Sequence, residues 1–342
     1  MTAGTIPRTA VRRALVRFPN WLGDTVMALP TLRSLRDAIP GAELWCLGPW
    51  VGSILEGEPG IARRFAPPGV VGARLVQARR LRQVPFDLAL ILTNSLETAL
   101  AGWLSGARWR VGYGDGRSVL LTHALRPDPA PVHQVAAYLR LLGPLGVDGP
   151  TPTIPSLVID VARRVEARRL LGEVDLPAGD PKVGLQLGAA LGPAKLWPVE
   201  RFAALAAGLE RRGIRTVLLG SPEARGLADA VAAAIGRPVR TLVGRDRPAL
   251  LAALVSELDV LVTADSGPAH VAAAVGVPTV TLFGPTDPRL TAPLGARQQV
   301  LWRQPPCGPC FLRECPIDHR CLRAIEVAEV EAAVMTAVGW RR

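Results

Sequence analysis

Lysine is almost missing from this chain of 342 residues: Lys182 and Lys195 are the only two, and the other 38 basic residues are arginine. Long apolar runs are missing as well. The longest, Val255–Val262 and Ala269–Val280, are interrupted by polar residues or proline and fall short of the roughly 18 uncharged residues that a membrane span needs. The N-terminus has neither the apolar core nor the small-residue cleavage site of a signal peptide. We therefore expect a cytoplasmic protein without a transmembrane segment.

The chain also lacks any concentration of charge. Its net charge of +11 is spread evenly, with 17 arginines against 11 acidic residues in 1–160 and 23 basic against 18 acidic residues in the remainder. No basic stripe or recognition-helix signature accompanies this charge, so we expect no nucleic-acid partner. Walker loops and strict G-x-G-x-x-G fingerprints are absent too, which disfavours P-loop enzymes and dinucleotide oxidoreductases. The positive charge favours anionic small molecules and an anionic membrane surface.

Apolar residues make up 49% of the chain and the mean hydropathy is +0.24, ample for packed cores. Short apolar runs alternate with helix-length segments, the pattern of βαβ units around parallel sheets. Prolines and glycines between 146 and 155 indicate a linker. We predict an α/β protein with two Rossmann-like domains, residues 1–150 and 151–342, and leave open that the last helix packs back on the N-terminal domain.

The alternation predicts individual elements. In the first half we expect strands at 14–18, 43–47 and 86–92 and helices at 25–38, 96–104 and 133–145. In the second half we expect strands at 183–187, 216–219, 241–243, 260–263 and 279–283 and helices at 161–171, 199–212, 223–235, 248–256 and 268–275. Ligands of open α/β sheets lie beyond the carboxyl ends of the strands, so the loops that follow these strands are the places to look for chemistry.

The first such loop is Pro19-Asn20-Trp21-Leu22-Gly23-Asp24. Gly23 permits close approach of the backbone to a ligand, and Trp21 is a large apolar surface outside any core period. Asp24 has two interpretations: it caps the helix expected at Thr25, or it serves as a general base at the mouth of a cleft.

The second loop runs from Gly188 to Pro198 and contains Lys195. Small residues after a strand present amides to an anion, and the lysine adds a point charge just before a helix. A loop lysine is usually solvated surface. That interpretation is weaker here because the chain has only one other lysine.

The third loop is Asp265-Ser266-Gly267-Pro268-Ala269-His270. Ser266 and Gly267 would place backbone amides at the N-terminus of a helix, which is a phosphate site. Asp265 would then accept hydrogen bonds from sugar hydroxyls. The alternative is that Asp265 or Ser266 is an N-cap and His270 a satisfied, partly buried histidine.

Two further loops are less specific. Glu223, in Gly220-Ser-Pro-Glu223, is either a ribose-binding carboxylate or an exposed first-turn residue stabilised by the helix dipole. The segment 283–288, Phe-Gly-Pro-Thr-Asp-Pro, either lines the same pocket or is only a turn.

Four of the five cysteines lie within fifteen positions: Cys307, Cys310, Cys315 and Cys321, with His319 among them. The C-x2-C spacing suits structural zinc, whereas the C-x5-C half is not a standard zinc-ribbon spacing. Reduced thiols and disulfides stay open as alternatives. Cys46, in an expected strand, is assigned to the core.

Five segments in this order resemble glycosyltransferase family 9, the ADP-heptose:lipopolysaccharide heptosyltransferases, and in particular its heptosyltransferase II branch. They are Asn20-Trp-Leu-Gly-Asp24 with Leu29-Pro30, Lys195-Leu-Trp-Pro-x-Glu-Arg-Phe202, Gly220-Ser-Pro-Glu223, Asp265-Ser-Gly-Pro-x-His270 and Phe283-Gly-Pro-Thr-Asp287. The resemblance spans nearly the whole chain and implies a GT-B fold, two Rossmann-like domains facing across a cleft.

The resemblance also implies roles. Asp24 matches the family's general base, and Asn20, Trp21 and Gly23 lie on the acceptor side. Lys195 matches the lysine that contacts the diphosphate. Donor binding is completed by Glu223, Asp265, Ser266, Gly267 and His270.

The implied reaction is inverting, metal-independent transfer of heptose from ADP-heptose to the lipid A-core oligosaccharide, by an enzyme with peripheral contact to the inner membrane. The alternatives are a family 9 transferase with another nucleotide sugar and a non-catalytic nucleotide-sugar-binding protein.

Overall fold

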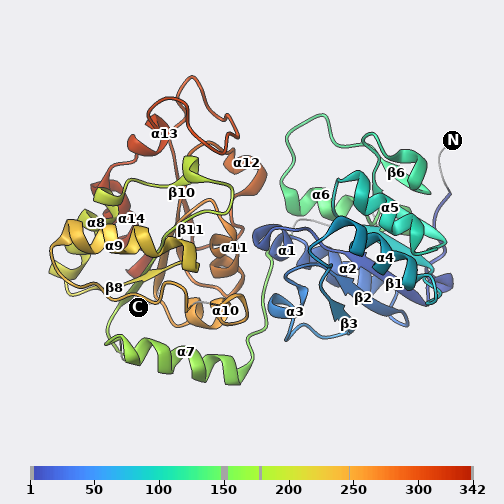
Figure 1. The fold of residues 1–342 in the computed structure, drawn as a ribbon, viewed down its shortest axis with the longest axis horizontal. Coiled ribbons are helices and arrows are strands. Elements are labelled where there is room, and N and C mark those ends of the chain that lie inside the picture. Colours follow the sequence, from blue (N-terminus) through green and yellow to red (C-terminus); the bar gives the residue numbers. More distant parts are fainter. Residues whose placement is uncertain (1–3, 148–152, 177–178, 246, 340–342) are drawn as a thin grey trace. The chain divides into compact units, whose positions relative to one another are not determined.

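The computed structural model describes residues 4–147, 153–176, 179–245 and 247–339. Contacts divide the chain into two compact units between Pro155 and Ser156, five residues after the predicted boundary (Figure 1). Residues 148–152, at the centre of the predicted linker, lie outside the described ranges.

The described residues of the first unit form an α/β unit with six strands. The strands are β1 (Arg13–Arg17), β2 (Glu43–Leu47), β3 (Ile61–Phe65), β4 (Leu88–Ile91), β5 (Trp109–Tyr113) and β6 (His123–Leu125). The α-helices are α1 (Leu22–Met27), α2 (Leu29–Ala38), α3 (Val51–Ile54), α4 (Val71–Leu81), α5 (Leu96–Leu104) and α6 (Gln134–Arg140). Short 3-10 turns are η1 (Arg8–Ala10), η2 (Ser118–Leu120) and η3 (Gly143–Leu145).

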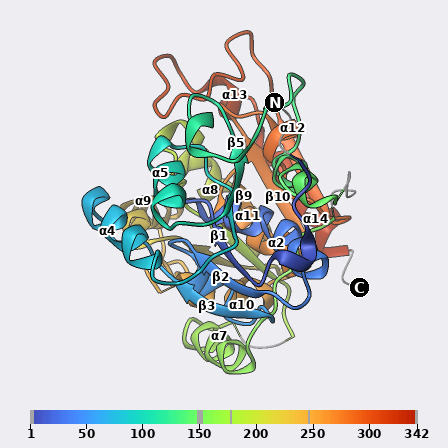
Figure 2. The ribbon, with the colours of Figure 1, turned by 90° about the vertical axis from the view of Figure 1, so that its right-hand side faces the viewer.

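The six strands form one parallel sheet in the order β3-β2-β1-β4-β5-β6, the order of a doubly wound nucleotide-binding sheet. Helices α4 and α5 cover one face, and α1, α2 and α6 pack together on the other (Figure 2). The buried faces of β1, β2 and β4 meet α5 in a core that includes Trp45, whose ring contacts Phe65 and Phe86 edge-on.

A buried arginine joins the loops that leave the carboxyl ends of β4 and β5. Arg117 is 1% exposed and donates to the carbonyl oxygens of Tyr113, Ser95 and Thr93. Burial lowers its pKa. Because three of its partners are backbone carbonyls, we infer that Arg117 fixes the shape of this edge of the sheet.

Five strands lie in the described part of the second unit. They are β7 (Lys182–Gln186), β8 (Arg215–Leu219), β9 (Val260–Ala264), β10 (Thr279–Phe283) and β11 (Gln298–Trp302). The α-helices are α7 (Val161–Glu173), α8 (Val199–Arg211), α9 (Arg225–Ile235), α10 (Pro248–Ser256), α11 (Gly267–Ala274), α12 (Pro288–Thr291), α13 (Arg320–Arg323) and α14 (Val327–Gly339). Two 3-10 turns, η4 (Pro193–Lys195) and η5 (Pro222–Ala224), follow β7 and β8.

The second sheet is also parallel, in the order β11-β10-β9-β7-β8. The predicted strand 241–243 is wrong as a strand: it is reduced to a single bridge between Thr241 and Leu218. Pro238 precedes this segment and Gly244, at φ +80°, ends it. The extended stretch between them is too short to form a ladder of hydrogen bonds with β8. With that bridge counted as a vestigial strand beside β8, the strand order of the first unit is repeated.

The final helix packs within the second unit. Helix α14 contacts α8, β9 and β10 of its own unit. That it also packs back on the N-terminal domain stays a prediction. Its buried side chains, among them Val330 and Val334, join the core that also contains Val262 and Leu282. This apolar face is therefore used inside the second unit.

The helix predicted at 25–38 is two helices that meet at Ala28. Pro30 has no amide hydrogen and stands in the first turn of α2, where a proline is tolerated only at the beginning of a helix. The predictions at 43–47, 96–104, 248–256 and 279–283 agree with the structure at both ends. None of the helices in the described ranges has the length and apolar run that a bilayer crossing requires.

Candidate active site

Three loops at the carboxyl edge of the second sheet converge on one buried carboxylate. The Lys195 ammonium, after β7, donates to the Asp265 carboxylate at 2.5 Å and to the Asp265 carbonyl oxygen at 2.9 Å. Thr286, after β10, donates its hydroxyl to the same carboxylate oxygen at 2.7 Å. The side chains of Lys195 and Asp265 are only 11% and 7% exposed, so Lys195 is not the solvated surface residue that a loop lysine usually is.

Lys195 is placed by the apolar residues that follow it. Trp197 is buried, packs edge-on against Phe202 at 5.2 Å between ring centroids, and donates its indole N–H to the Ile325 carbonyl oxygen at 3.2 Å. The loop that carries Lys195 is therefore anchored, just after the lysine, to the core beneath α8.

Thr286 is the residue that sequence reasoning left unassigned. Segment 283–288 was expected either to line the pocket or to form a turn, and its buried threonine reaches Asp265. The signal that could have singled it out is strand order, because β10 lies directly beside β9 and their loops must meet.

Ser266 stands at the N-cap position of α11, but neither it nor Asp265 caps the helix through its side chain. The Ser266 hydroxyl is 3.1 Å from the Thr263 hydroxyl, while the Asp265 carboxylate is held by Lys195 and Thr286. Gly267 opens the helix and His270 is buried one turn later. The helix thus begins with backbone amides and no side-chain cap, as an anion site requires.

Glu223 lies in η5 after β8 and is exposed. Hydrogen bonds from the Ser221 hydroxyl and from its own amide lower its pKa. The loops after β7 and β8 touch: a Cβ placed on Gly220 would lie 2.9 Å from the Leu187 carbonyl oxygen. Glu223 is therefore on the same edge of the sheet as Lys195.

In the first unit, Asp24 is not a helix cap. Helix α1 begins at Leu22 with Trp21 at the N-cap position, which leaves Asp24 inside the first turn. Its carboxylate accepts a hydrogen bond from the hydroxyl of Tyr138 in α6. Burial, and then the charge of Asp24, raise the pKa of Tyr138 well above its usual value. The phenol therefore stays protonated and orients the carboxylate.

The turn before Asp24 is held from two sides. The buried Arg17 guanidinium donates to the Asn20 side-chain oxygen at 2.7 Å and also to the Phe18 carbonyl oxygen. The Trp50 indole donates to the Asn20 carbonyl oxygen at 2.8 Å. Desolvation lowers the pKa of Arg17 to about 10. Gly23 is buried, whereas Trp21 is 51% exposed, as a ligand-contacting ring would be.

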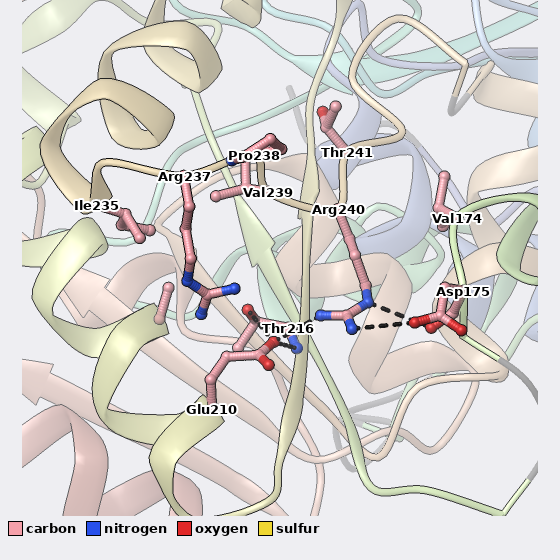
Figure 3. A pocket seen from close by; sticks show the side chains of 11 residues that line it. Val174, Asp175, Glu210, Thr216, Ile235, Arg237, Pro238, Val239, Arg240 and Thr241 are labelled. Carbon is pink, nitrogen blue, oxygen red and sulfur yellow. Dashed lines mark hydrogen bonds and ion pairs between the residues drawn. The ribbon is translucent and has the colours of Figure 1, made fainter.

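A separate pocket of about 370 Å³ lies at the amino end of β8 and contains none of the predicted site residues. Figure 3 shows Arg240 between Asp175 and Glu210; its nitrogen atoms are 3.2 Å and 2.9 Å from their carboxylates. The Arg240 charge is paired within the wall, and the pocket lies at the edge of the sheet opposite to Lys195. We do not assign the donor to it.

The cysteine cluster is spread along a surface segment. All five cysteines are free; Cys307 and Cys310 are exposed, and Cys315 and Cys321 are half-buried. Backbone N–H groups, among them that of His319 at 3.3 Å, lower the pKa of the Cys315 thiol. In the described ranges no three His, Cys, Asp or Glu side chains are arranged around a metal position. Cys46 is buried in β2, as expected for the core, and burial raises its pKa to about 12.

The sequence profile of glycosyltransferase family 9 (heptosyltransferase) matches residues 74–320. The chain belongs to glycosyltransferase family 9. Among its curated relatives, lipopolysaccharide heptosyltransferase 2 of Salmonella typhimurium is 31% identical over 278 residues, which cover 76% of this family 9 chain and 79% of the relative. The Escherichia coli protein of the same name is 30% identical over the same shares.

Solved structures agree with this family 9 glycosyltransferase over nearly its whole length. E. coli ADP-heptose lps heptosyltransferase II has a TM-score of 0.81 and 26% identity, covering 96% of this chain and 99% of that one. A family 9 glycosyl transferase from Veillonella parvula has a TM-score of 0.83 and 25% identity, covering 99% and 98%. The predicted GT-B fold and the predicted family are confirmed.

The ion pair of this glycosyltransferase gives a stability prediction. Lys195→Met and Asp265→Asn should each lower the free energy of unfolding by about 3–5 kcal/mol, because each leaves a buried charge without its partner. The double variant should cost clearly less than the sum, since both charges are then gone. Urea unfolding of the four proteins measures the coupling.

The half-exposed pair Arg320–Asp318 provides the matched control. Its double-mutant cycle should be close to additive, because water screens the two charges. Additive effects at Lys195 and Asp265 would mean that the two side chains do not depend on each other.

Proposed function

We propose that this glycosyltransferase moves heptose from ADP-heptose to the inner core of lipopolysaccharide, with inversion at the anomeric carbon. The observation that carries the proposal is the buried cluster of Lys195, Asp265 and Thr286 beside the start of α11, in a chain of this family. The curated relatives are named for the same transfer to lipopolysaccharide, and E. coli heptosyltransferase II for ADP-heptose. A family of transferases disfavours the non-catalytic sugar-binding alternative.

On the donor side, the diphosphate would lie against the Lys195 ammonium and the first amides of α11. Both are fixed before the ligand arrives: the ammonium by Asp265, the amides by the helix. Preorganised positive groups stabilise the charge that develops on a leaving diphosphate without rearrangement of solvent. The exposed Glu223 carboxylate is proposed to accept hydrogen bonds from the ribose hydroxyls.

On the acceptor side, Asp24 is the proposed general base. Its carboxylate takes the proton of the acceptor hydroxyl as that oxygen forms a bond to the anomeric carbon of the heptose. The bond from that carbon to the diphosphate oxygen breaks, and ADP leaves with the electron pair. Tyr138 holds the carboxylate, while Asn20 and Trp21 face the acceptor.

Calorimetric titration with ADP and with UDP, in the presence of EDTA, tests the donor assignment. We expect ADP to bind more tightly than UDP without metal, and Lys195→Met to weaken ADP binding by at least 10-fold. Lys182→Met is the matched control because Lys182 begins the same strand β7 at its opposite end and should leave ADP binding unchanged. Preference for UDP would assign another nucleotide sugar; ADP binding that is equal in both variants would remove Lys195 from the diphosphate site.

Asp24→Asn tests the base. We expect the transfer rate to fall by about 10²–10⁴-fold while ADP affinity stays as in the unchanged protein, because a general base acts in the reaction and not in donor binding. Single-turnover transfer to a purified acceptor, beside ADP titration, separates the two effects. Full turnover by the asparagine variant would exclude Asp24 as the base.

We also propose a cytoplasmic enzyme that contacts the anionic inner membrane through α4. Val70, Val71 and Val76 are exposed on this helix and its N-cap, and its C-terminal end presents exposed arginines at 79, 80 and 82. Exposed apolar groups next to basic ones suit a lipid surface with anionic headgroups.

Co-sedimentation with phosphatidylglycerol vesicles tests this contact. Replacing the arginines at 79, 80 and 82 with glutamine should weaken binding by roughly 100-fold at most, at about 1 kcal/mol for each charge near the surface. A control variant loses three exposed arginines of the second unit, at 211, 225 and 237. Equal losses in both variants would reduce the effect to net charge, and equal binding to phosphatidylcholine vesicles would contradict an electrostatic contact.

Structural zinc at Cys307, Cys310, Cys315 and Cys321 stays a prediction, with no role in the reaction. Metal analysis of protein purified without added zinc checks it. One equivalent of zinc that is lost in Cys310→Ser would support the site. Substoichiometric metal would leave reduced thiols or disulfides, which thiol titration with and without reductant separates.

A further inference from the structure

The cysteine-rich segment from Cys307 to Cys321, here called the strap, lies on the loop that carries Lys195. The Ala194 amide donates to the Arg313 carbonyl oxygen at 3.0 Å, and the Arg313 guanidinium donates back to the Leu191 carbonyl oxygen at 2.9 Å. One strap residue is therefore hydrogen-bonded on both sides of Gly192, within four residues of the lysine.

Gly192 makes this contact possible. Its φ of +146° is unfavourable for other residues, and a Cβ on it would lie 2.5 Å from the Arg313 carbonyl oxygen. Neither atom belongs to a flexible side-chain end, so a larger residue here must push the strap and the loop apart. The glycine is needed for the contact with the strap as well as for the turn.

The strap also holds the loop that carries Thr286. The Phe311 amide donates to the Pro285 carbonyl oxygen at 2.8 Å, one residue before Thr286. Just beyond the strap, Leu322 packs so closely on Gly284 that a Cβ there would lie 2.8 Å from the leucine Cγ. The strap therefore connects the two loops whose side chains hold Asp265.

The strap has little apolar packing of its own. Phe311, Leu312 and Ile317 are 51%, 45% and 56% exposed. Its hydrogen bonds to the two loops therefore provide a substantial part of what holds the strap in place. The same hydrogen bonds hold the two loops.

We propose that the strap is a positioning element of the diphosphate site and that Arg313 is a positioning residue, joining the Lys195 loop to the Thr286 loop. Arg313 does not touch the donor; it acts through the position of the ammonium and of Asp265. This inference rests on the proposed binding of a nucleoside diphosphate at Lys195.

ADP titration and donor kinetics of Arg313→Ala test the proposal. We expect ADP affinity to fall by about 3- to 10-fold, the worth of one lost hydrogen bond, with a raised KM for the donor and an unchanged melting temperature. Arg313→Lys, which keeps a donor, should restore part of the affinity. Gly192→Ala should lose more than Arg313→Ala because its Cβ displaces the strap.

Arg320→Ala is the control on the same strap: this arginine pairs with Asp318 and should leave ADP affinity unchanged. The proposal is overturned if neither Arg313→Ala nor Arg320→Ala loses ADP affinity. It is also overturned if both lose the same affinity, because that result would show only an effect of the lost positive charge. Hydrogen exchange in a peptide spanning 188–196 provides a readout without donor. Faster exchange there in Gly192→Ala is expected, and an unchanged rate would contradict the strap's role even if ADP does not bind.

Discussion

The buried ion pair between Lys195 and Asp265 is the constraint on which the second unit's functional edge depends. Two charges that are about nine-tenths removed from water are costly unless each has its partner. Asp265 accepts from Lys195 and from Thr286, so the loops after β7, β9 and β10 must close on one another for the pair to exist. The pair thus selects one arrangement of three loops. A ligand that meets the ammonium meets it already oriented.

The first unit uses an analogous arrangement with a different chemistry. Arg17 and Trp50 hold the Asn20 turn, and Tyr138 holds the carboxylate that follows it. Both units have the same strand order, one complete and one with a strand reduced to a bridge. Repetition of one scaffold therefore does not dictate repetition of its chemistry: one sheet edge presents a carboxylate and the other an ammonium.

Much of the fold could be predicted because its central strands are continuous apolar runs bounded by turn residues. The strands that were not predicted are those without a continuous apolar run between turn residues. Strand β3 is half-buried and carries Arg63 and Arg64, the former stacked on Trp45, and β11 contains two glutamines. The break at Ala28 depends on Pro30. A proline is tolerated in the first turn of a helix and interrupts it further along, so its effect cannot be predicted until the start of the helix is known.

The candidate site was predictable residue by residue, but its connections were not. Asp24, Lys195 and Asp265 stand after strands, where the topology of such sheets directs attention. Tyr138 and Thr286 became visible only when the fold brought α6 to α1 and β10 to β9. Local pattern does not encode contacts between residues that are far apart in the chain. The cluster of cysteines drew attention to its sulfur atoms, whereas its hydrogen bonds to the loops are made mainly by backbone atoms.

That dependence on the backbone has a consequence for how this part of the protein can change over generations. The strap meets the Lys195 loop chiefly through the Arg313 carbonyl oxygen and the Ala194 amide, atoms that every residue other than proline supplies. Most side chains along the strap can change without loss of this backbone contact. An insertion or deletion before Arg313 would shift the wrong carbonyl onto Gly192. The segment should therefore tolerate substitution and resist changes in length.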